Sequence, residues 1–169
     1  MTVLVVLGVA GSGKSTVGAA LAARMGVPFA DGDDLHPRSN VEKMAAGRPL
    51  SDTDRWPWLD RIRSWMSDHD PSVVACSALK PGYRDRLRPA QFVYLKIGRE
   101  LAQERLTGRF GHFFKADLLD SQFAALQEPG PEELDVLTID STASVEDLVQ
   151  FIIDNVSGLA SGQSQLPGQ

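Results

Sequence analysis

Short, continuous runs of apolar residues recur along the chain, and many of their members are β-branched. Runs that are apolar at every position are typical of strands covered on both faces, as in a parallel sheet. Such runs occupy residues 3–7, 73–76, 92–97 and 136–139, and the segment "VPFAD" at residues 27–31 is a shorter fifth candidate. The pattern therefore predicts five strands in a parallel sheet.

The segments between these runs carry apolar residues at helical spacing. They predict helices over residues 14–25, 52–67, 82–87, 100–106, 116–126 and 145–155. Within the second of these, Pro57 fits only the first turn, because proline has no N–H to donate. Strands that alternate with helices imply βαβ units, right-handed crossovers and a three-layer α/β fold. We expect one domain over residues 1–156 and a frayed, Gly-, Ser- and Gln-rich tail over residues 157–169.

Composition narrows the classes of function. The 169 residues carry a net charge of -5, which argues against a nucleic-acid surface, because such surfaces are usually basic. The apolar run at the N-terminus is too short to cross a membrane and lacks the basic start of a signal peptide. Cys76 is the one cysteine, so no internal disulfide can form, and a reducing cytoplasm is the simple expectation.

The most specific motif is "GVAGSGKS" at residues 8–15, which matches G-x-x-x-x-G-K-[ST] at every fixed position. Its glycines allow successive N–H groups to turn inward, and the helix that follows adds positive potential at its N-terminus. We expect Lys14 to reach the β- and γ-phosphates of a nucleoside triphosphate and Ser15 to hold Mg²⁺. A glycine-rich turn that binds nothing is the alternative. The cofactor-binding candidates are Gly11, Ser12, Gly13, Lys14, Ser15 and Thr16.

An acidic turn, "ADGDDLHPRSN", follows the shortest apolar run. On an extended segment, Asp31 and Asp33 share one face, so one can serve a metal while the other accepts a proton from a hydroxyl group. Ligands of open α/β sheets gather beyond the carboxyl ends of the strands, so we expect this turn beside the phosphate loop. The alternative is an Asx-type turn on the surface.

Basic and polar groups follow two further apolar runs. In "CSALKPGYRDRLR", an ammonium and a guanidinium are suited to an anionic substrate, with ordinary surface charges as the alternative. In "ERLTGRFGHFF", glycines, arginines and aromatic residues predict a mobile lid over about residues 107–116, with a solvated helix end as the alternative. The candidates in these two segments are Ser77, Lys80, Arg84, Arg105, Arg109 and His112.

Four segments together resemble the gluconate kinases (gluconokinases), small P-loop kinases related to shikimate and adenylate kinases. The segments are "DGDDLHPRSNVEKMAAGRPLSDTDRWPWL", "CSALKPGYRDRLR", "FVYLK" and "GHFFKADLLDSQFAALQEP". The resemblance implies phosphorylation of D-gluconate by ATP at its terminal hydroxyl, giving 6-phosphogluconate. It also implies an adenylate-kinase-like fold, with a five-stranded parallel sheet in the order 2-3-1-4-5 and a lid. Such enzymes are often dimers, so a homodimer is expected, with D-gluconate as the small-molecule partner; from charge and hydropathy we expect no nucleic-acid or membrane partner.

The residues and the resemblance together suggest a role for each candidate. We expect Lys14, Asp33 and Arg109 to be catalytic, with Asp33 orienting the acceptor hydroxyl and Arg109 closing over the phosphates. Asp31 is expected to assist Ser15 at the metal. Arg105 is expected to join Arg109 over the phosphates, with stacking of one of the two on adenine as the alternative. The expected gluconate-binding residues are Asp33, His36, Arg55, Ser77, Lys80, Arg84 and His112. A shikimate or nucleoside monophosphate kinase is the nearest alternative, and a nucleotide switch without transfer chemistry is another.

Overall fold

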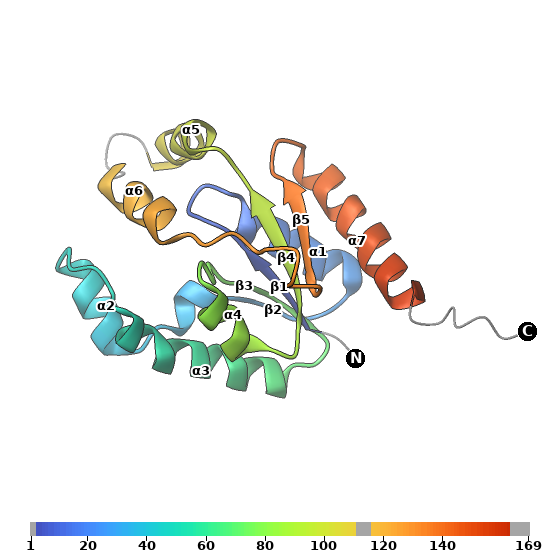
Figure 1. The fold of residues 1–169 in the computed structure, drawn as a ribbon, viewed down its shortest axis with the longest axis horizontal. Helices are drawn as coiled ribbons and strands as arrows, with labels where there is room; N and C mark the ends of the chain where they lie inside the picture. The colour runs from blue at the N-terminus through green and yellow to red at the C-terminus, as the bar shows by residue number, and fades with distance from the viewer. Residues whose placement is uncertain (1–2, 111–115, 163–169) are drawn as a thin grey trace, which may run out of the picture.

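Five parallel strands form the sheet at the centre of the fold (Figure 1). The computed structural model describes residues 3–110 and 116–162. The strands lie in the order β2-β3-β1-β4-β5, as predicted. Their bounds are β1 Val3–Leu7, β2 Phe29–Asp31, β3 Ser72–Ala75, β4 Gln91–Lys96 and β5 Val136–Asp140.

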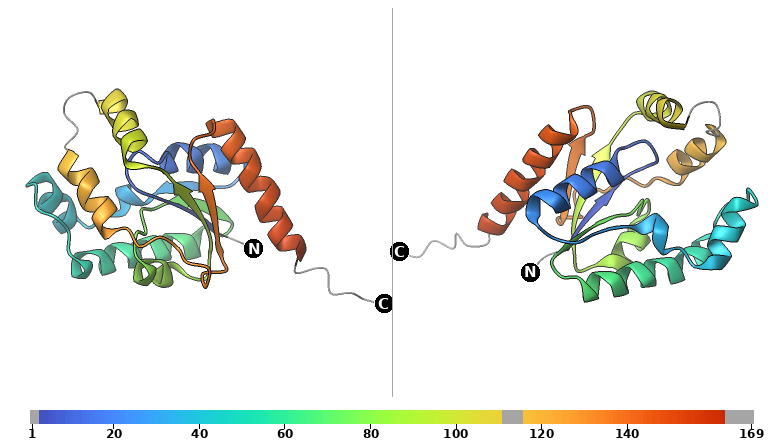
Figure 2. Two further views of the ribbon diagram at one scale, coloured as in Figure 1. Left: turned by 45° about the horizontal axis from the view of Figure 1, so that its top comes forward. Right: turned by 180° about the vertical axis from the view of Figure 1, so that it is seen from behind.

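Helices cover both faces of the sheet (Figure 2). On one face lie α1 and α7, and on the other α3 and α4, which makes the three predicted layers. A 3-10 helix, η1, and the helix α2 were not predicted. The bounds are α1 Lys14–Met25, η1 Gly32–Leu35, α2 Arg38–Ala45, α3 Asp52–Asp68, α4 Pro81–Leu87, α5 Arg99–Phe110, α6 Ala116–Ala125 and α7 Val145–Gly162.

The central strand β1 shows why its sequence is apolar at every position. Leu4 and Val6 pack against α1 and α7, whereas Val5 and Leu7 pack against α3 and α4. Alternate residues of a strand point to opposite faces, so a strand covered on both faces needs apolar residues throughout. A third apolar cluster, which includes Val9 and Leu106, joins α5 and α6 to the phosphate-loop end of β1.

Two local predictions need correction, and the predicted lid stays a prediction. Pro57 lies inside α3 and not in its first turn, because the helix begins at Asp52 behind a capping box formed by Ser51 and Asp54. Helix α7 continues to Gly162, so the predicted tail is helical over residues 157–162, since extending a formed helix costs little. Of the predicted lid, residues 107–110 belong to α5, and residues 111–115 lie outside the described residues.

Over the described residues, no helix combines the length and apolar character that a membrane crossing requires.

Candidate active site

The phosphate loop connects β1 to α1 and leaves the first turn of α1 open. Gly11 and Gly13 have φ angles of 81° and 89°, a left-handed conformation that favours glycine. A Cβ atom on Gly11 would lie 2.7 Å from the carbonyl oxygen of Ala102 in α5. No side chain caps the N-terminus of α1 within the described structure, so its first N–H groups can meet an anion.

A cavity of about 200 Å³ opens at this loop. Six of the seven residues that line it belong to the predicted cofactor-binding set, and Leu106 is the seventh. The six are Gly11, Gly13, Lys14, Ser15, Thr16 and Arg105. The structure therefore gathers five loop residues and an arginine from a distant helix around one space.

Ser12, the remaining member of the predicted cofactor-binding set, does not line this cavity, and its predicted role stays a prediction. Its side chain is buried, and its N–H donates to the carbonyl of Val9 at 3.2 Å. Its carbonyl accepts a hydrogen bond from the hydroxyl of Ser141 at 2.5 Å, and Arg105 also donates to it at 3.4 Å. Ser12 therefore anchors the loop to the end of β5, and the loop sequence alone gave no signal for Ser141.

The acidic turn meets the phosphate loop directly. The hydroxyl of Ser15 donates to Oδ2 of Asp31 at 2.7 Å, although 16 residues separate them in the chain. The other carboxylate oxygen of Asp31 accepts the N–H of Asp33 at 3.0 Å and so caps η1. The first aspartate of the turn and the serine of the motif thus form one contact.

The side chain of Asp33 in η1 is exposed to solvent, yet protein atoms surround much of its carboxyl group. This crowding raises the pKa of Asp33, the nearby Lys14 lowers it, and the negative charges of Asp31 and Asp34 raise it further. The charges of Lys14 and Asp33 therefore act on one another. A carboxylate with a raised pKa is a better proton acceptor than an ordinary one.

Helix α3 supports the turn that carries Asp33 through one hydrogen bond. Trp58 donates from its indole N–H to the carbonyl of Gly32 at 2.7 Å. A Cβ on Gly32 would lie 2.8 Å from the carbonyl oxygen of Ala75 at the end of β3, so only glycine fits there. Trp58 is itself buried in the core, so the same side chain packs the core and supports this turn.

The contact between Ser15 and Asp31 suits Mg²⁺. Magnesium is bound in nucleotide sites by one or two protein oxygens together with phosphates and water, not by a complete protein cage. Among the described residues, there is no cluster of three or more His, Cys, Asp or Glu side chains that would form such a cage. One hydroxyl and one carboxylate beside a phosphate loop therefore fit a nucleotide-bound magnesium ion.

The predicted substrate side contains a charged cluster around Tyr83. Lys80 donates to Asp52 at 3.0 Å, and the hydroxyl of Tyr83 donates to the same carboxylate oxygen. These hydrogen bonds, the one from Tyr83 first, lower the pKa of Asp52. Arg55 lies over the Tyr83 ring at 5.6 Å from its centroid and donates to the carbonyl of Leu50 at 2.7 Å. Lys80 and Arg55 thus come together, and Lys80 already binds one carboxylate.

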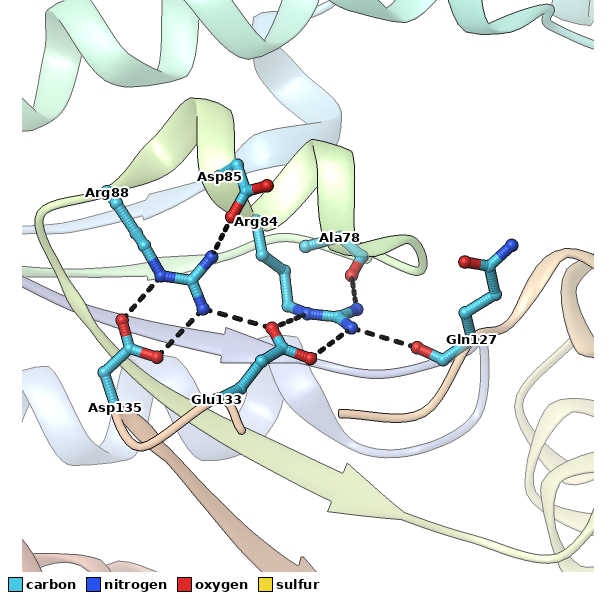
Figure 3. A network of polar contacts seen from close by, with 7 residues as sticks. All are labelled: Ala78, Arg84, Asp85, Arg88, Gln127, Glu133 and Asp135. Carbon is cyan, nitrogen blue, oxygen red and sulfur yellow. Dashed lines mark hydrogen bonds and ion pairs between the residues drawn. The ribbon is translucent and has the colours of Figure 1, made fainter. Parts of the chain in front are cut away.

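Arg84 is not available to a substrate, contrary to the prediction. Its side chain is 0% exposed and makes two hydrogen bonds, of 2.7 and 2.8 Å, to the carboxylate of Glu133 (Figure 3). It also donates to the carbonyls of Ala78 and Gln127 at 2.9 and 3.0 Å. The prediction failed because the partner, Glu133, lies 49 residues away in the chain.

The buried arginine supports the loop that carries Ser77 and Lys80. Ala78 in this loop has a φ angle of 40°, a left-handed conformation that is uncommon outside glycine. The hydrogen bond from Arg84 to its carbonyl holds this backbone in place. Ser77 itself is half-buried.

Two residues near the site were missed by the sequence analysis. Gln122 of α6 accepts the N–H of Ala10 in the phosphate loop at 2.6 Å, and Asn40 of α2 lies against His36. Both contacts join separate elements, so only a resemblance or an alignment could have indicated them. The side chain of Arg109 and all of His112 lie outside the described residues, so their predicted roles stay predictions.

The sheet order and the phosphate loop define a class, the small P-loop kinases. The family model described as shikimate kinase matches residues 10–157. Among curated proteins, the thermoresistant gluconokinase of Escherichia coli is 44% identical over 160 residues, covering 90% of this chain and 91% of the relative. The gluconokinase of Gluconobacter oxydans is 46% identical, covering 77% and 78%.

A solved structure agrees with these relatives. The gluconokinase from Sinorhizobium meliloti is 40% identical, superposes with a TM-score of 0.89 and covers 96% of this chain and 95% of its own. The chain therefore belongs to the gluconokinase family, within the wider group that the shikimate kinase model describes. This confirms the family resemblance inferred from the sequence.

Proposed function

We propose that this protein uses ATP to phosphorylate D-gluconate at its terminal hydroxyl, giving 6-phosphogluconate. The observation that carries the proposal is the 2.7 Å contact between Ser15 and Asp31, which joins the nucleotide loop to the acidic turn. The relatives described as gluconokinases supply the choice of substrate. A nucleotide switch would need a carboxylate at the metal, as Asp31 provides, but no second group such as Asp33 to act on an acceptor hydroxyl.

On the nucleotide side, the loop N–H groups and Lys14 would hold the β- and γ-phosphates, with Ser15 and Asp31 beside the metal. Bound ATP with Mg²⁺ supplies the phosphoryl group and neutralises its charge. Asp33 would accept a hydrogen bond from the acceptor hydroxyl, orient it in line and take its proton. Arg105 lines the nucleotide cavity, and Arg109 would close over the phosphates as part of a lid.

On the substrate side, Lys80 is our candidate for the gluconate carboxylate. In the absence of a substrate it pairs with Asp52, and both side chains of this pair are partly exposed, so exchange for another carboxylate costs little. Arg55, His36 and Ser77 would receive the hydroxyl chain, together with His112. Arg84 is withdrawn from this set, because its donors are bound to Glu133 and two carbonyls.

The test is a panel of acceptors in a coupled assay of ADP release. D-gluconate is compared with shikimate, AMP and other sugar acids at equal concentration, and a Lys14→Met variant prepared in parallel reveals any contaminating kinase. We expect rapid turnover with gluconate and almost none with shikimate or AMP. Faster turnover with shikimate or AMP would reject gluconate as the substrate, and turnover that survives in Lys14→Met would reject the phosphate loop as its origin.

We also propose a cytoplasmic location, supported by the lone, buried Cys76. Burial raises the pKa of this thiol to about 12, so it is not a reactive nucleophile. The dimer implied by the resemblance stays a prediction for this chain.

A further inference from the structure

Asn40, a buried residue of α2, links His36 to the helix α3. Its side-chain nitrogen lies 2.9 Å from the backbone carbonyl oxygen of Asp54 and 3.2 Å from Nδ1 of His36. Asn40 is only 3% exposed, so water does not compete freely for these contacts. The sequence assigns no role to this asparagine.

These two contacts together fix the position of the proton on His36. A carbonyl oxygen can only accept, so the atom of Asn40 that faces Asp54 must be the NH₂ group and not the amide oxygen. The same NH₂ group has a second hydrogen, and it points to Nδ1 of His36 as an acceptor. A neutral imidazole that accepts at Nδ1 carries its proton on Nε2.

The ring of His36 is also held in one plane. It stacks on Trp58 with a centroid distance of 4.3 Å and an interplanar angle of 10°. Trp58 is itself fixed by its hydrogen bond to Gly32, in the turn that carries Asp33. The orientation of the ring is thus tied to the same turn as the proposed acceptor of the hydroxyl proton.

The surroundings keep this ring neutral. Burial lowers the pKa of His36 to about 4, and the positive charges of Arg55 and Arg61 on α3 act in the same direction. Over the part of the chain that the structure describes, Nε2 has no protein acceptor for its proton. A neutral ring whose Nε2–H donor is fixed in direction and has no protein acceptor is suited to donate a hydrogen bond to an oxygen atom of a ligand.

We propose that Asn40 is a positioning residue that holds His36 as the Nε2–H tautomer, so that Nε2–H donates to a hydroxyl or carboxylate oxygen of the sugar acid. The ligand contact rests on the proposed function, whereas the tautomer does not. Asn40 acts only through His36. The hydrogen bond from Nε2–H of His36 favours a substrate that has an acceptor oxygen at this position.

The first experiment needs no substrate. The imidazole nitrogens of ¹⁵N-histidine-labelled protein are observed by NMR at neutral pH, and the signals of His36 are assigned by their loss in His36→Gln. The chain has three histidines, so this assignment is tractable. We expect a protonated Nε2 and an unprotonated Nδ1 in the parent, and a mixture of tautomers in Asn40→Ala. A protonated Nδ1 at His36 in the parent would overturn the proposal.

The second experiment separates donation from a structural role. In His36→Gln the side-chain amide can replace the Nε2–H donor, whereas His36→Leu keeps bulk but has no donor. One hydrogen bond to a neutral group corresponds to about a 3- to 10-fold change in affinity. We expect KM for gluconate to rise by about that factor in His36→Leu, with kcat and KM for ATP nearly unchanged, and to stay within about twofold in His36→Gln.

Equal KM values for gluconate in the two variants would contradict donation by His36, even if Asn40→Ala fails to fold. If the parent has no gluconate kinase activity, the proposed function fails, and the NMR result still decides the tautomer. The two failures are therefore distinguishable.

Discussion

Replacing Arg84 tests whether this residue builds the substrate loop or binds the substrate. In Arg84→Met, four hydrogen bonds disappear and Glu133, whose side chain is 10% exposed, loses its main partner. Breaking a buried ion pair by removing one partner costs about 3–5 kcal/mol. For a domain of this size, about 4 kcal/mol lowers Tm by roughly 8–16 °C.

The matched control is Arg86→Met, on the same helix. Arg86 pairs with Asp60 on the surface, where both side chains are about half exposed, so its loss should change stability little. Urea unfolding followed by circular dichroism compares the two variants, and a coupled assay measures KM for gluconate in each. The account is refuted if Arg84→Met is as stable as Arg86→Met and instead shows a greatly raised KM for gluconate.

The ion pair between Arg84 and Glu133 also makes the free energy of unfolding depend on pH. Hydrogen bonds from Arg84, and then from Arg88, lower the pKa of Glu133 from 4.5 to about 2 in the folded protein. A carboxyl whose folded pKa is lowered contributes stability above its unfolded pKa, and this contribution is lost as the pH falls toward the folded pKa. The difference in unfolding free energy between the parent and Arg84→Met should therefore narrow between pH 4.5 and pH 2. A difference that stays constant over this range would argue against the ion pair.

Two further substitutions probe the packing around the site. Gly32→Ala should lower Tm and activity together, because its Cβ would lie 2.8 Å from the carbonyl of Ala75, whereas Gly98→Ala, with no atom within 4 Å of its Cβ, should leave both almost unchanged. Equal Tm values for the two variants would contradict this packing. Gln122→Leu removes the acceptor for the N–H of Ala10 and should cost about 1 kcal/mol in urea unfolding; no loss would mean that water replaces the glutamine.

The sequence predicted the parts of this protein that depend on local or periodic signals. Continuous apolar runs located the strands, and the glycines, Lys14 and Ser15 of one motif located the nucleotide loop. The neighbouring position of Asp31 followed from a topological rule, because the carboxyl ends of parallel strands meet at one edge of the sheet. The contact between Ser15 and Asp31 agrees with that rule.

The failures concern residues whose partners are distant in the chain. An arginine after a strand end resembles a ligand group, and nothing near Arg84 indicates that Glu133 neutralises it. Helix α2 was missed because its exposed Val41 and Met44 provide no clear apolar face for the core. Asn40 looks like an ordinary polar helix residue until the carbonyl of Asp54 and the ring of His36 are placed beside it.

The most direct test of the central claim is the turnover of Asp33→Asn with gluconate, measured beside its affinity for ATP. The claim is that the acidic turn and the phosphate loop serve one phosphoryl transfer, with Asp33 acting on the acceptor hydroxyl. Loss of a general base predicts a fall in kcat of about 10²- to 10⁴-fold with nearly unchanged ATP binding, whereas the control Asp34→Asn in the same turn should stay active. Near-normal kcat in Asp33→Asn would contradict the account.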